Sequence, residues 1–364
     1  MLPKGCIAAI ESLCARFFWS GNIEKKEKAK IAWDTVCLPK KEGGLGIRSI
    51  QVWNQVLGLK FIWLLLSRSP SLWSDWHTTE HLSTCSFWEI TPSQTDSWAW
   101  KKILQLHPIA IQFCKTVVGN GRNASFWFDV WTPLGQLIKI LGSRGPRALR
   151  LRKEAKVADA ISHSRWNLPH PRSQQEVDLH TYLTTISLPL STDVDDVFEW
   201  QATDYPLNVF NSQATWEILR PRQPDQPWHD VVWFKGAVPK HAFTMWVTNY
   251  DRLPTRTRLA AWGLTIPDTC PLCASLPETR DHLFLSCRYT YDIWSQAPLS
   301  DVCRKLAVQA VIFQIWKQRN NLIHNNAYLP PSSVFRAIDR EIRNIISSRR
   351  STKQFNSLMV MWLV

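Results

Sequence analysis

The sequence has no hydrophobic run long enough to cross a lipid bilayer and no N-terminal block typical of a secretory signal. The most apolar stretch, residues 56–66, is interrupted by Lys60, whereas a membrane-spanning helix needs about 20 apolar residues. The first twenty residues carry Lys4, Glu11 and Arg16 and no clean apolar block. We therefore expect no membrane association, and a buried helix over the apolar stretch.

The sequence also gives no indication of the oxidising compartment in which a disulfide framework forms. Without a secretory signal, the nine cysteines are expected in a reducing compartment, where disulfides rarely persist. Six of them are scattered, at positions 6, 14, 37, 85, 114 and 303, and such cysteines usually fill cores. The other three lie within residues 270–287, and clustered cysteines in this setting indicate a metal site.

Motifs for nucleotide binding or paired-carboxylate chemistry are missing too. The Gly-rich stretch G-G-L-G-I-R at residues 43–48 lacks both the G-x-G-x-x-G spacing and a following Gly-Lys-Ser/Thr, so we interpret it as a structural turn. The only adjacent acidic pair, Asp195-Asp196, lies in a polar stretch. We interpret this pair as part of a solvated loop, and we expect no enzymatic activity from it.

Composition is that of a folded protein with an anionic partner. Apolar residues make up 45% and charged residues 20% of 364 residues, which suits two or three folded domains. The net charge of +13 favours nucleic acid, either RNA or single-stranded DNA, as the partner. We expect an intracellular location, in the nucleus rather than the cytoplasm. Most of the twenty-one tryptophans are expected to anchor cores or interfaces.

Residues 270–287 arrange three cysteines and one histidine as C-x2-C-x8-H-x4-C, formed by Cys270, Cys273, His282 and Cys287. Zinc takes four nitrogen or sulfur ligands in a tetrahedron, and Cys-x2-Cys is the usual turn by which two thiolates hold the ion. The five-residue step from His282 to Cys287 would separate these side chains by about 140° on an ideal helix. We therefore expect a short helix that carries His282 and ends or distorts near Ser286, which brings Cys287 back to the metal.

Three thiolates and a neutral imidazole would complete the coordination shell and leave no position for a reacting water. The pattern therefore predicts a structural Zn²⁺ site and no catalytic residue. Two alternatives stay open. Cys273 or Cys287 could act as a nucleophile with His282 as its base, but the sequence shows no third orienting group and no substrate cleft. The thiols could also be buried and inert, with no metal.

Basic residues gather in two places that suit phosphate contacts. Residues 143–156 carry six basic residues and one Glu, and Arg147, Arg150 and Arg152 are candidate contacts; a solvated loop and helix face is the alternative. Around the cysteine pattern lie five arginines: Arg252, Arg256, Arg258, Arg280 and Arg288. The nearby aromatic residues complete the mix that single-stranded nucleic acid favours, or else form the core of the module: Trp246, Trp262, Tyr289 and Trp294.

Periodicity and turn signals predict a mainly α fold with short β hairpins (α+β), organised as a multi-segment helical protein with a small CCHC zinc-binding module. Gly119-Asn120-Gly121 predicts a hairpin between two short strands. The polar, Pro-punctuated residues 170–196 predict a linker. Thr255 is the expected N-cap of a helix that stops at Gly263.

Several short motifs occur in one order from residue 231 to 294: WFKGAVPK, RLPT, C-P-x-C, E-T-x-x-H-L-F and C-x6-W. In this order they resemble the zinc-binding domain found downstream of the reverse transcriptase in plant non-LTR, LINE-type retrotransposons. Other segments are similar to those that link the polymerase to this domain or follow it: LPKGCIAAIESLCARFFWSG, AWDTVCLPKKEGGLGIR, VVGNGRNASFWFDVW and IWKQRNNLIH. The resemblance implies that Cys270, Cys273, His282 and Cys287 ligate zinc.

The departures from the family pattern limit what this resemblance implies. The family's polymerase motif, aromatic-x-Asp-Asp, does not occur, and Asp195-Asp196 has the wrong neighbours. We also expect no endonuclease before residue 1 and no ribonuclease H after residue 330. The predicted regions are C-terminal helices of a reverse-transcriptase-like region (1–76), a Trp-rich connecting region with a hairpin and a polar linker (77–195), the zinc-binding domain (196–296) and C-terminal helices (297–364).

The sequence therefore predicts a non-catalytic, zinc-binding and nucleic-acid-binding fragment of a LINE-type retroelement reverse transcriptase. One alternative is a protein-interaction scaffold that binds a protein partner through the Trp-rich middle region. The other is a retroelement remnant without function.

Overall fold

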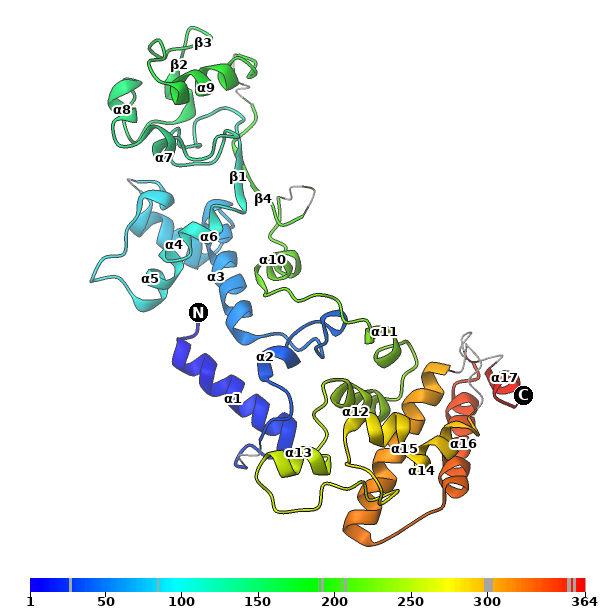
Figure 1. Cartoon of the computed structure of the whole chain (residues 1–364). Helices are drawn as coiled ribbons and strands as arrows, with labels where there is room; N and C mark the ends of the chain where they lie inside the picture. Colours follow the sequence, from blue (N-terminus) through cyan, green and yellow to red (C-terminus); the bar gives the residue numbers. More distant parts are fainter. Residues whose placement is uncertain are drawn as a thin grey trace. The chain divides into compact units, whose positions relative to one another are not determined.

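The computed structural model describes the chain except for residues 26–27, 84, 189, 191–192, 204, 206–207, 298–303, 352–354, 356–357 and 364. About 51% of the chain is helical and the few strands are short, so the predicted mainly α class is confirmed (Figure 1). The chain forms two compact units. Unit 1 comprises Met1–Ala8 and Ile50–Arg220, and unit 2 comprises Ala9–Ser49 and Pro221–Val364. These contact-based units group the four predicted regions differently, and those region boundaries stay a prediction.

The helices and strands follow the chain in order. Helix α1 (Lys4–Ser20) begins in unit 1 and ends in unit 2. Unit 1 contains α3 (Ile50–Leu66), α4 (Leu72–His81), η2 (Phe87–Glu89), α5 (Trp98–Leu104), α6 (His107–Ala110), β1 (Cys114–Val117), α7 (Leu137–Leu141), α8 (Gly145–Ala148), η3 (Val157–Ala160), β2 (Ile161–Ser162), β3 (Arg165–Trp166), α9 (Gln174–Leu183), β4 (Val197–Trp200) and α10 (Ser212–Leu219). Unit 2 contains α2 (Trp33–Val36), η1 (Lys40–Glu42), α11 (His229–Val232), α12 (Pro239–Asn249), α13 (Arg256–Ala261), η4 (His282–Ser286), α14 (Arg288–Trp294), α15 (Arg304–Asn325), α16 (Pro331–Ser348) and α17 (Leu358–Leu363).

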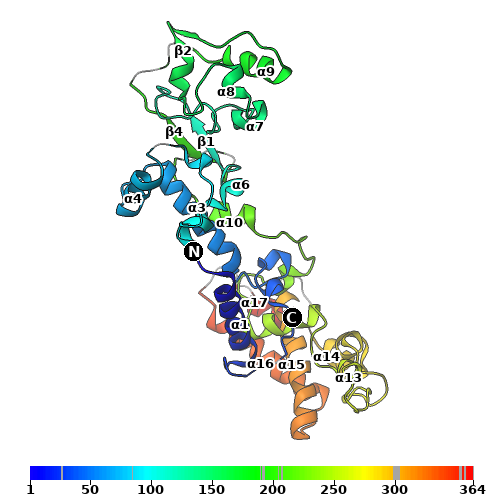
Figure 2. The same ribbon diagram turned by 90° about the vertical axis from the view of Figure 1, so that its left-hand side faces the viewer.

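Unit 2 is built around the packing of α12, α15 and α16 (Figures 1 and 2). Helix α16 buries Val334, Ile338, Ile342 and Ile346, one residue per turn, because apolar side chains at these spacings share one helix face. The same core includes Cys270, Cys287 and neighbouring side chains of the cysteine pattern. The pattern is therefore part of the main core of unit 2.

The Gly-rich turn near residue 43 has the structural role that the sequence indicated. The carbonyl of Gly43 accepts hydrogen bonds from the Trp246 indole N–H at 2.7 Å and from the Tyr250 hydroxyl at 3.1 Å. Gly43 has φ = +95°, and a Cβ there would collide with that hydroxyl. Only glycine suits this turn, because its backbone is left-handed and α12 lies directly against it.

Unit 1 has two cores. One lies around α3 and α5 and includes Trp63, Trp100 and Trp200. The other includes Trp127 and Trp131 and is enclosed by α7, α8 and α9, which lie close together in both views (Figures 1 and 2). These five tryptophans are buried, as the sequence predicts for large apolar anchors.

The predicted hairpin around Gly119-Asn120-Gly121 is wrong. Strand β1 pairs antiparallel with β4, about eighty residues later in the chain, with Cys114 opposite Trp200 and Val117 opposite Val197. The local hairpin of unit 1 is instead formed by β2 and β3. Sequence reasoning missed the long-range pairing because a Gly-Asn-Gly turn also suits a loop that is held by a distant side chain.

That distant side chain belongs to Asp196, so the interpretation of this residue as part of a solvated loop is wrong. Its Oδ1 accepts the backbone N–H groups of Gly119 and Gly121, and its Oδ2 accepts those of Asn123 and Ala124, all at 2.8 Å. A carboxylate is the acceptor that can satisfy four backbone donors at once. Asp196 therefore holds the loop of residues 119–124 beside the start of β4.

The predicted linker, residues 170–196, contains a packed helix among its described residues. Helix α9 lies within it, and its Ser173 N-cap side chain accepts the N–H of Glu176. Leu179 and Leu183 are buried in the second core of unit 1. The linker prediction was wrong here because a few apolar residues are enough to pack a helix against a core when they recur one helical turn apart.

No helix in the described part of the chain has the length and hydropathy of a membrane span.

Replacement of Asp196 by asparagine should destabilise unit 1 by at least about 2 kcal/mol. The asparagine amide has one acceptor oxygen, whereas the aspartate carboxylate has two. Its NH₂ group would face two of the four backbone N–H groups, and these two would be left without an acceptor. We expect faster amide hydrogen exchange in residues 119–124 and a lower midpoint of chemical unfolding. Asp195→Asn is the control, because Asp195 is exposed and among the described residues its carboxylate accepts the Asn120 side-chain amide. A shift below about 0.5 kcal/mol is expected for it.

The same interaction has a defined pH dependence. Burial acts to raise the pKa of Asp196, but the four backbone donors outweigh it and lower that pKa below its ordinary value. A depressed pKa contributes stability above the unfolded-state pKa, about 3.9, which is lost as the pH falls through the folded-state value. The difference between the parent chain and Asp196→Asn should therefore be full at neutral pH and shrink below about pH 4. A difference that stays constant down to pH 2 would contradict this assignment.

Candidate metal centre

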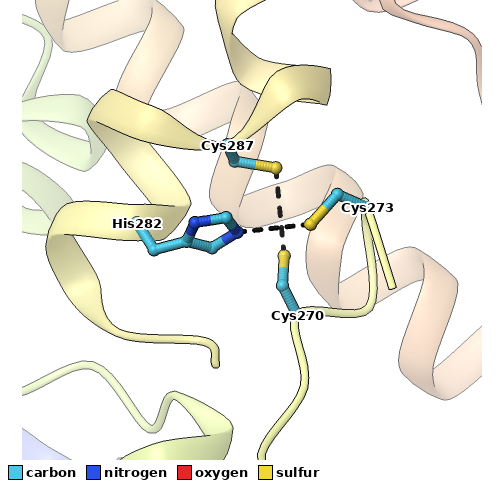
Figure 3. Close-up of side chains that lie close together, drawn as sticks. All are labelled: Cys270, Cys273, His282 and Cys287. Carbon is cyan, nitrogen blue, oxygen red and sulfur yellow. Dashed lines mark hydrogen bonds between the residues drawn. The ribbon is translucent and has the colours of Figure 1, made fainter. Parts of the chain in front are cut away.

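The structure brings Cys270, Cys273, His282 and Cys287 together. Their four donor atoms all lie within 4.8 Å of one another. The Sγ atoms of Cys270 and Cys287 are 4.0 Å apart, and Cys273 Sγ is 3.3 Å from His282 Nε2. Figure 3 shows the four side chains pointing toward one another from two segments of the chain. This is the only group of metal-ligand type found among the residues that the structure describes.

The first two cysteines are positioned by a tight turn. The backbone N–H groups of Leu272 and Cys273 donate to the Cys270 sulfur, and the N–H of Ala274 donates to the Cys270 carbonyl at 2.8 Å. The N–H of Cys270 donates in turn to the carbonyl of Leu276 at 2.7 Å. Backbone donors aimed at a sulfur favour its thiolate form, which is the form that binds metal.

The second pair is positioned by a distorted helix, as the sequence predicts. Residues His282–Ser286 form one π-helical turn, closed by the hydrogen bond from Cys287 N–H to the His282 carbonyl at 2.7 Å. The extra residue in this i to i+5 turn brings Cys287 round toward His282, which a regular α-helix would not do. Thr279 Oγ1 accepts the His282 N–H at 3.0 Å. Cys287 is then the N-cap residue of α14.

The donor set fits a zinc ion. With Zn–S bonds of about 2.3 Å and a Zn–N bond of about 2.0 Å, a tetrahedron has S···S edges of about 3.8 Å and S···N edges of about 3.5 Å. The observed 4.0 Å and 3.3 Å lie close to these values. Cys270 and Cys287 are fully buried and His282 is nearly so. Four ligands would fill the shell, so the arrangement suits a closed structural site and leaves no place for a reacting water.

The Sγ atoms of Cys270 and Cys287 share a hydrogen bond. The hydrogen bond between them lowers the pKa of Cys287 to about 5, and the same bond, together with burial, raises the pKa of Cys270. The backbone N–H groups of Tyr289 and Thr290, at the start of α14, also lower the pKa of Cys287. The N-terminal end of a helix favours negative charge. The site is therefore prepared for a thiolate on the α14 side.

Residues 210–294 match one protein family, described as zinc-binding in reverse transcriptase. The resemblance is confirmed over this segment. The four converging side chains lie inside it, and so do Glu278 and the π-helical turn. The zinc-binding segment begins near α10 and ends with α14.

Two proteins of Arabidopsis thaliana are similar to the chain. One, named "Putative ribonuclease H protein", is 25% identical over 311 residues, which cover 81% of this chain and 48% of that protein. The other, named "Uncharacterized mitochondrial protein", is 26% identical over 141 residues, which cover 37% of this chain and 92% of that protein. The chain thus spans about half the length of the first relative. No solved structure matches the chain.

Sequence reasoning gave no role to a buried ion pair that joins Glu278 of the zinc-binding segment to Arg319 of α15. Glu278 is fully buried, and its two carboxylate oxygens accept Arg319 Nε at 2.7 Å and Nη2 at 2.8 Å. Glu278 Oε2 also accepts the backbone N–H of Arg256 at 2.6 Å. Arg319 Nη2 donates further to the Pro254 carbonyl at 3.1 Å. Both residues lie in motifs noted above, E-T-x-x-H-L-F and IWKQRNNLIH, but only the fold shows that they pair.

This pair corrects the predicted cap of α13. Thr255 is the N-cap residue by position, but its side chain makes no capping hydrogen bond. The Glu278 carboxylate satisfies the first free N–H of the helix instead, as anionic groups do at helix N-termini. The predicted stop at Gly263 is observed, with φ = +87°.

The five arginines predicted to contact nucleic acid differ in their surroundings. Arg252 and Arg288 are exposed, and the described part of the chain offers them no carboxylate partner. Arg258 lies 3.9 Å from Asp251 and over the Trp262 ring, and Arg280 pairs with Asp281 at 2.7 Å. Arg256 is half-buried and donates to the Thr269 carbonyl. The exposed Arg147, Arg150 and Arg152 belong to unit 1.

Most of the aromatic residues near the cysteine pattern belong to the core, which was the alternative interpretation. Trp246 is fully buried and Tyr289 nearly so. Trp294 is half-buried, with its indole N–H bound to the Phe284 carbonyl at 2.8 Å. Trp262 is 52% exposed. Of these four aromatics, Trp262 alone presents a ring to solvent.

Replacement of Glu278 by alanine should destabilise unit 2 by about 3–5 kcal/mol, because the Arg319 guanidinium would stay buried without its counter-charge. The measurement is the denaturant midpoint of the full chain, with hydrogen exchange to locate the loss in unit 2.

The double variant Glu278→Leu/Arg319→Met is the matched control. It removes both charges and keeps an apolar filling, so it should recover at least half of the lost stability. Equal loss in the single and double variants would show that the hydrogen bonds to Arg256 and Pro254 matter more than the buried charge.

Proposed function

We propose that this chain is a non-catalytic, zinc-stabilised, nucleic-acid-binding part of a LINE-type retroelement reverse transcriptase. The observation that carries the proposal is the closed Cys₃His cluster inside the segment that matches the reverse-transcriptase zinc-binding family. In this proposal Cys270, Cys273, His282 and Cys287 hold one Zn²⁺. The ion supplies cross-linking of two chain segments and no reaction chemistry.

The position of the cluster supports a structural role for zinc. The turn of residues 270–273 and the π-helical turn before α14 meet in the core that also contains α12, α15 and α16. The thiolates carry three negative charges, which the apolar surroundings would disfavour without a cation. Zinc therefore supplies the compensating charge that lets this core close.

Charge and exposed arginines support an anionic partner. The chain carries a net charge of +13, and Arg252 and Arg288 are exposed within the zinc-binding segment. Phosphate contacts of this kind give affinity without sequence preference. We therefore propose single-stranded RNA or DNA as the partner of unit 2, and Arg147, Arg150 and Arg152 as further contacts on unit 1.

We propose no catalysis by this chain. The name of the first relative refers to ribonuclease H, but the similarity spans 48% of that protein. The adjacent acidic residues Asp195 and Asp196 are used by the fold, since Asp196 binds four backbone N–H groups. Incubation of the purified chain with an RNA–DNA hybrid and Mg²⁺ should leave the RNA strand intact.

The purified chain should contain about one zinc ion, and Cys270→Ser or His282→Ala should bring the metal content close to zero. Loss of the ion should increase protease sensitivity and hydrogen exchange around residues 230–296, because the ligands lie in the core of unit 2. Unit 1 should keep its protection, since its cores contain none of the four ligands. Metal content by mass spectrometry, followed by exchange before and after chelation, measures both effects.

Cys14→Ser is the matched control, because Cys14 is exposed and lies outside the cluster. It should retain full zinc content and parental exchange. Full protection of residues 230–296 after complete removal of the metal would refute the structural role.

Binding of single-stranded RNA should weaken steeply with salt, with a log–log slope of about −0.7 per phosphate contact. Removal of two such contacts in Arg252→Ala/Arg288→Ala should lower the slope by about 1.4 and the affinity by about tenfold. Lys317→Ala/Arg343→Ala removes the same charge from α15 and α16 and is the control. Salt-independent binding, or none, would instead favour a protein-interaction scaffold.

A further inference from the structure

A pocket of about 510 Å³ lies within unit 2, where α13 and the segment 264–267 approach the C-terminal half of α15. Five of its twelve lining residues come from α15: Trp316, Arg319, Asn320, Ile323 and His324. Residues at these spacings follow one face of a helix. The volume is within the range of small-molecule and nucleotide sites.

The lining combines flat apolar surface with positive charge. Seven of the twelve residues are apolar, among them Trp316, Leu264 and Ile323. Lys30 and Arg256 add positive charge, whereas the charge of Arg319 is balanced by Glu278. No carboxylate of the described residues is part of the lining. A ligand that fits must therefore bring apolar flat surface and negative charge together.

Hydrogen bonds and a ring contact within unit 2 hold the walls of the pocket in place. The Arg319 guanidinium lies 4.8 Å over the Trp316 ring, and its bonds to Glu278 fix it there. The Arg256 side chain is anchored to the Thr269 carbonyl at 2.9 Å. On the other side, the N–H of Leu264 donates to the Leu259 carbonyl at 3.2 Å. The pocket thus keeps its shape without a ligand, which lowers the entropy cost of binding.

We propose that this pocket is a base-binding subsite for single-stranded nucleic acid. One nucleobase packs against Trp316 and the aliphatic wall, while the neighbouring phosphates lie beside Lys30 and Arg256. Single-stranded sites elsewhere combine these two elements, an aromatic surface for the base and a basic groove for the backbone. The inference rests on the proposed nucleic-acid binding and assigns a place and a chemistry to it.

Leu264→Asp tests the pocket directly. Leu264 is 48% exposed, so the substitution should be tolerated by the fold, and it places a carboxylate against the base and its phosphate. Leu329→Asp is the matched control, because Leu329 is 45% exposed, lies in unit 2 and is not part of the lining. Both variants change the net charge equally, so any difference between them belongs to the pocket.

The probe is a deoxythymidine oligonucleotide of about 12 nucleotides with one central 2-aminopurine. Stacking on Trp316 should quench its fluorescence in the parent chain and in Leu329→Asp. Leu264→Asp should lose the quenching and bind about tenfold more weakly. Circular dichroism and zinc content of both variants should equal those of the parent.

The outcomes separate this inference from the proposed function. Equal affinities of the two variants, with retained binding, would overturn the pocket and leave nucleic-acid binding intact. Failure of the parent chain to bind any oligonucleotide would overturn both. Binding of an acidic amphipathic peptide that Leu264→Asp abolishes, with unchanged oligonucleotide binding, would assign the pocket to a protein ligand and overturn the proposal.

Discussion

The Glu278 carboxylate joins parts of unit 2 that lie far apart in the chain. It binds the Arg319 guanidinium of α15 and the first backbone N–H of α13, and it lies four residues before the ligand His282. Because the pair is buried, its charges interact more strongly than they would in water. The position of the π-helical turn relative to α15 follows from this contact, and so does the wall of the proposed base-binding pocket. The four converging side chains close the segment locally, and the ion pair connects it to the rest of unit 2.

Unit 1 depends on a similar use of a carboxylate. Asp196 binds four backbone N–H groups of the loop 119–124 and positions the strand that pairs with β1. In both units an acidic side chain satisfies backbone donors that no regular secondary structure reaches. Both carboxylates are fully committed to the fold.

Local sequence signals predicted the structural features that depend on residues close together in the chain. The helices, the turn at Gly43 and the distortion between His282 and Cys287 follow from periodicity, glycine chemistry and ligand spacing. The pairing of β1 with β4 and of Glu278 with Arg319 could not be predicted in this way, since each joins residues tens of positions apart. A Gly-Asn-Gly sequence or a charged residue in a motif has several local interpretations, and only the three-dimensional contacts decide among them.

The contacts also limit what net charge implies about binding. An excess of thirteen positive charges suggests a broad basic surface, but three of the five arginines near the cysteine pattern are used internally: Arg256, Arg258 and Arg280. Three of the four aromatics there are buried or half-buried. A binding site for single strands needs both exposed charge and an accessible apolar surface. In unit 2 these two properties coincide at the pocket beside Trp316, where the exposed Lys30 lines apolar walls and the described lining contains no acid. We therefore propose that the segment with the cysteine cluster acts through the surfaces that it positions, because four ligands would close its own metal shell.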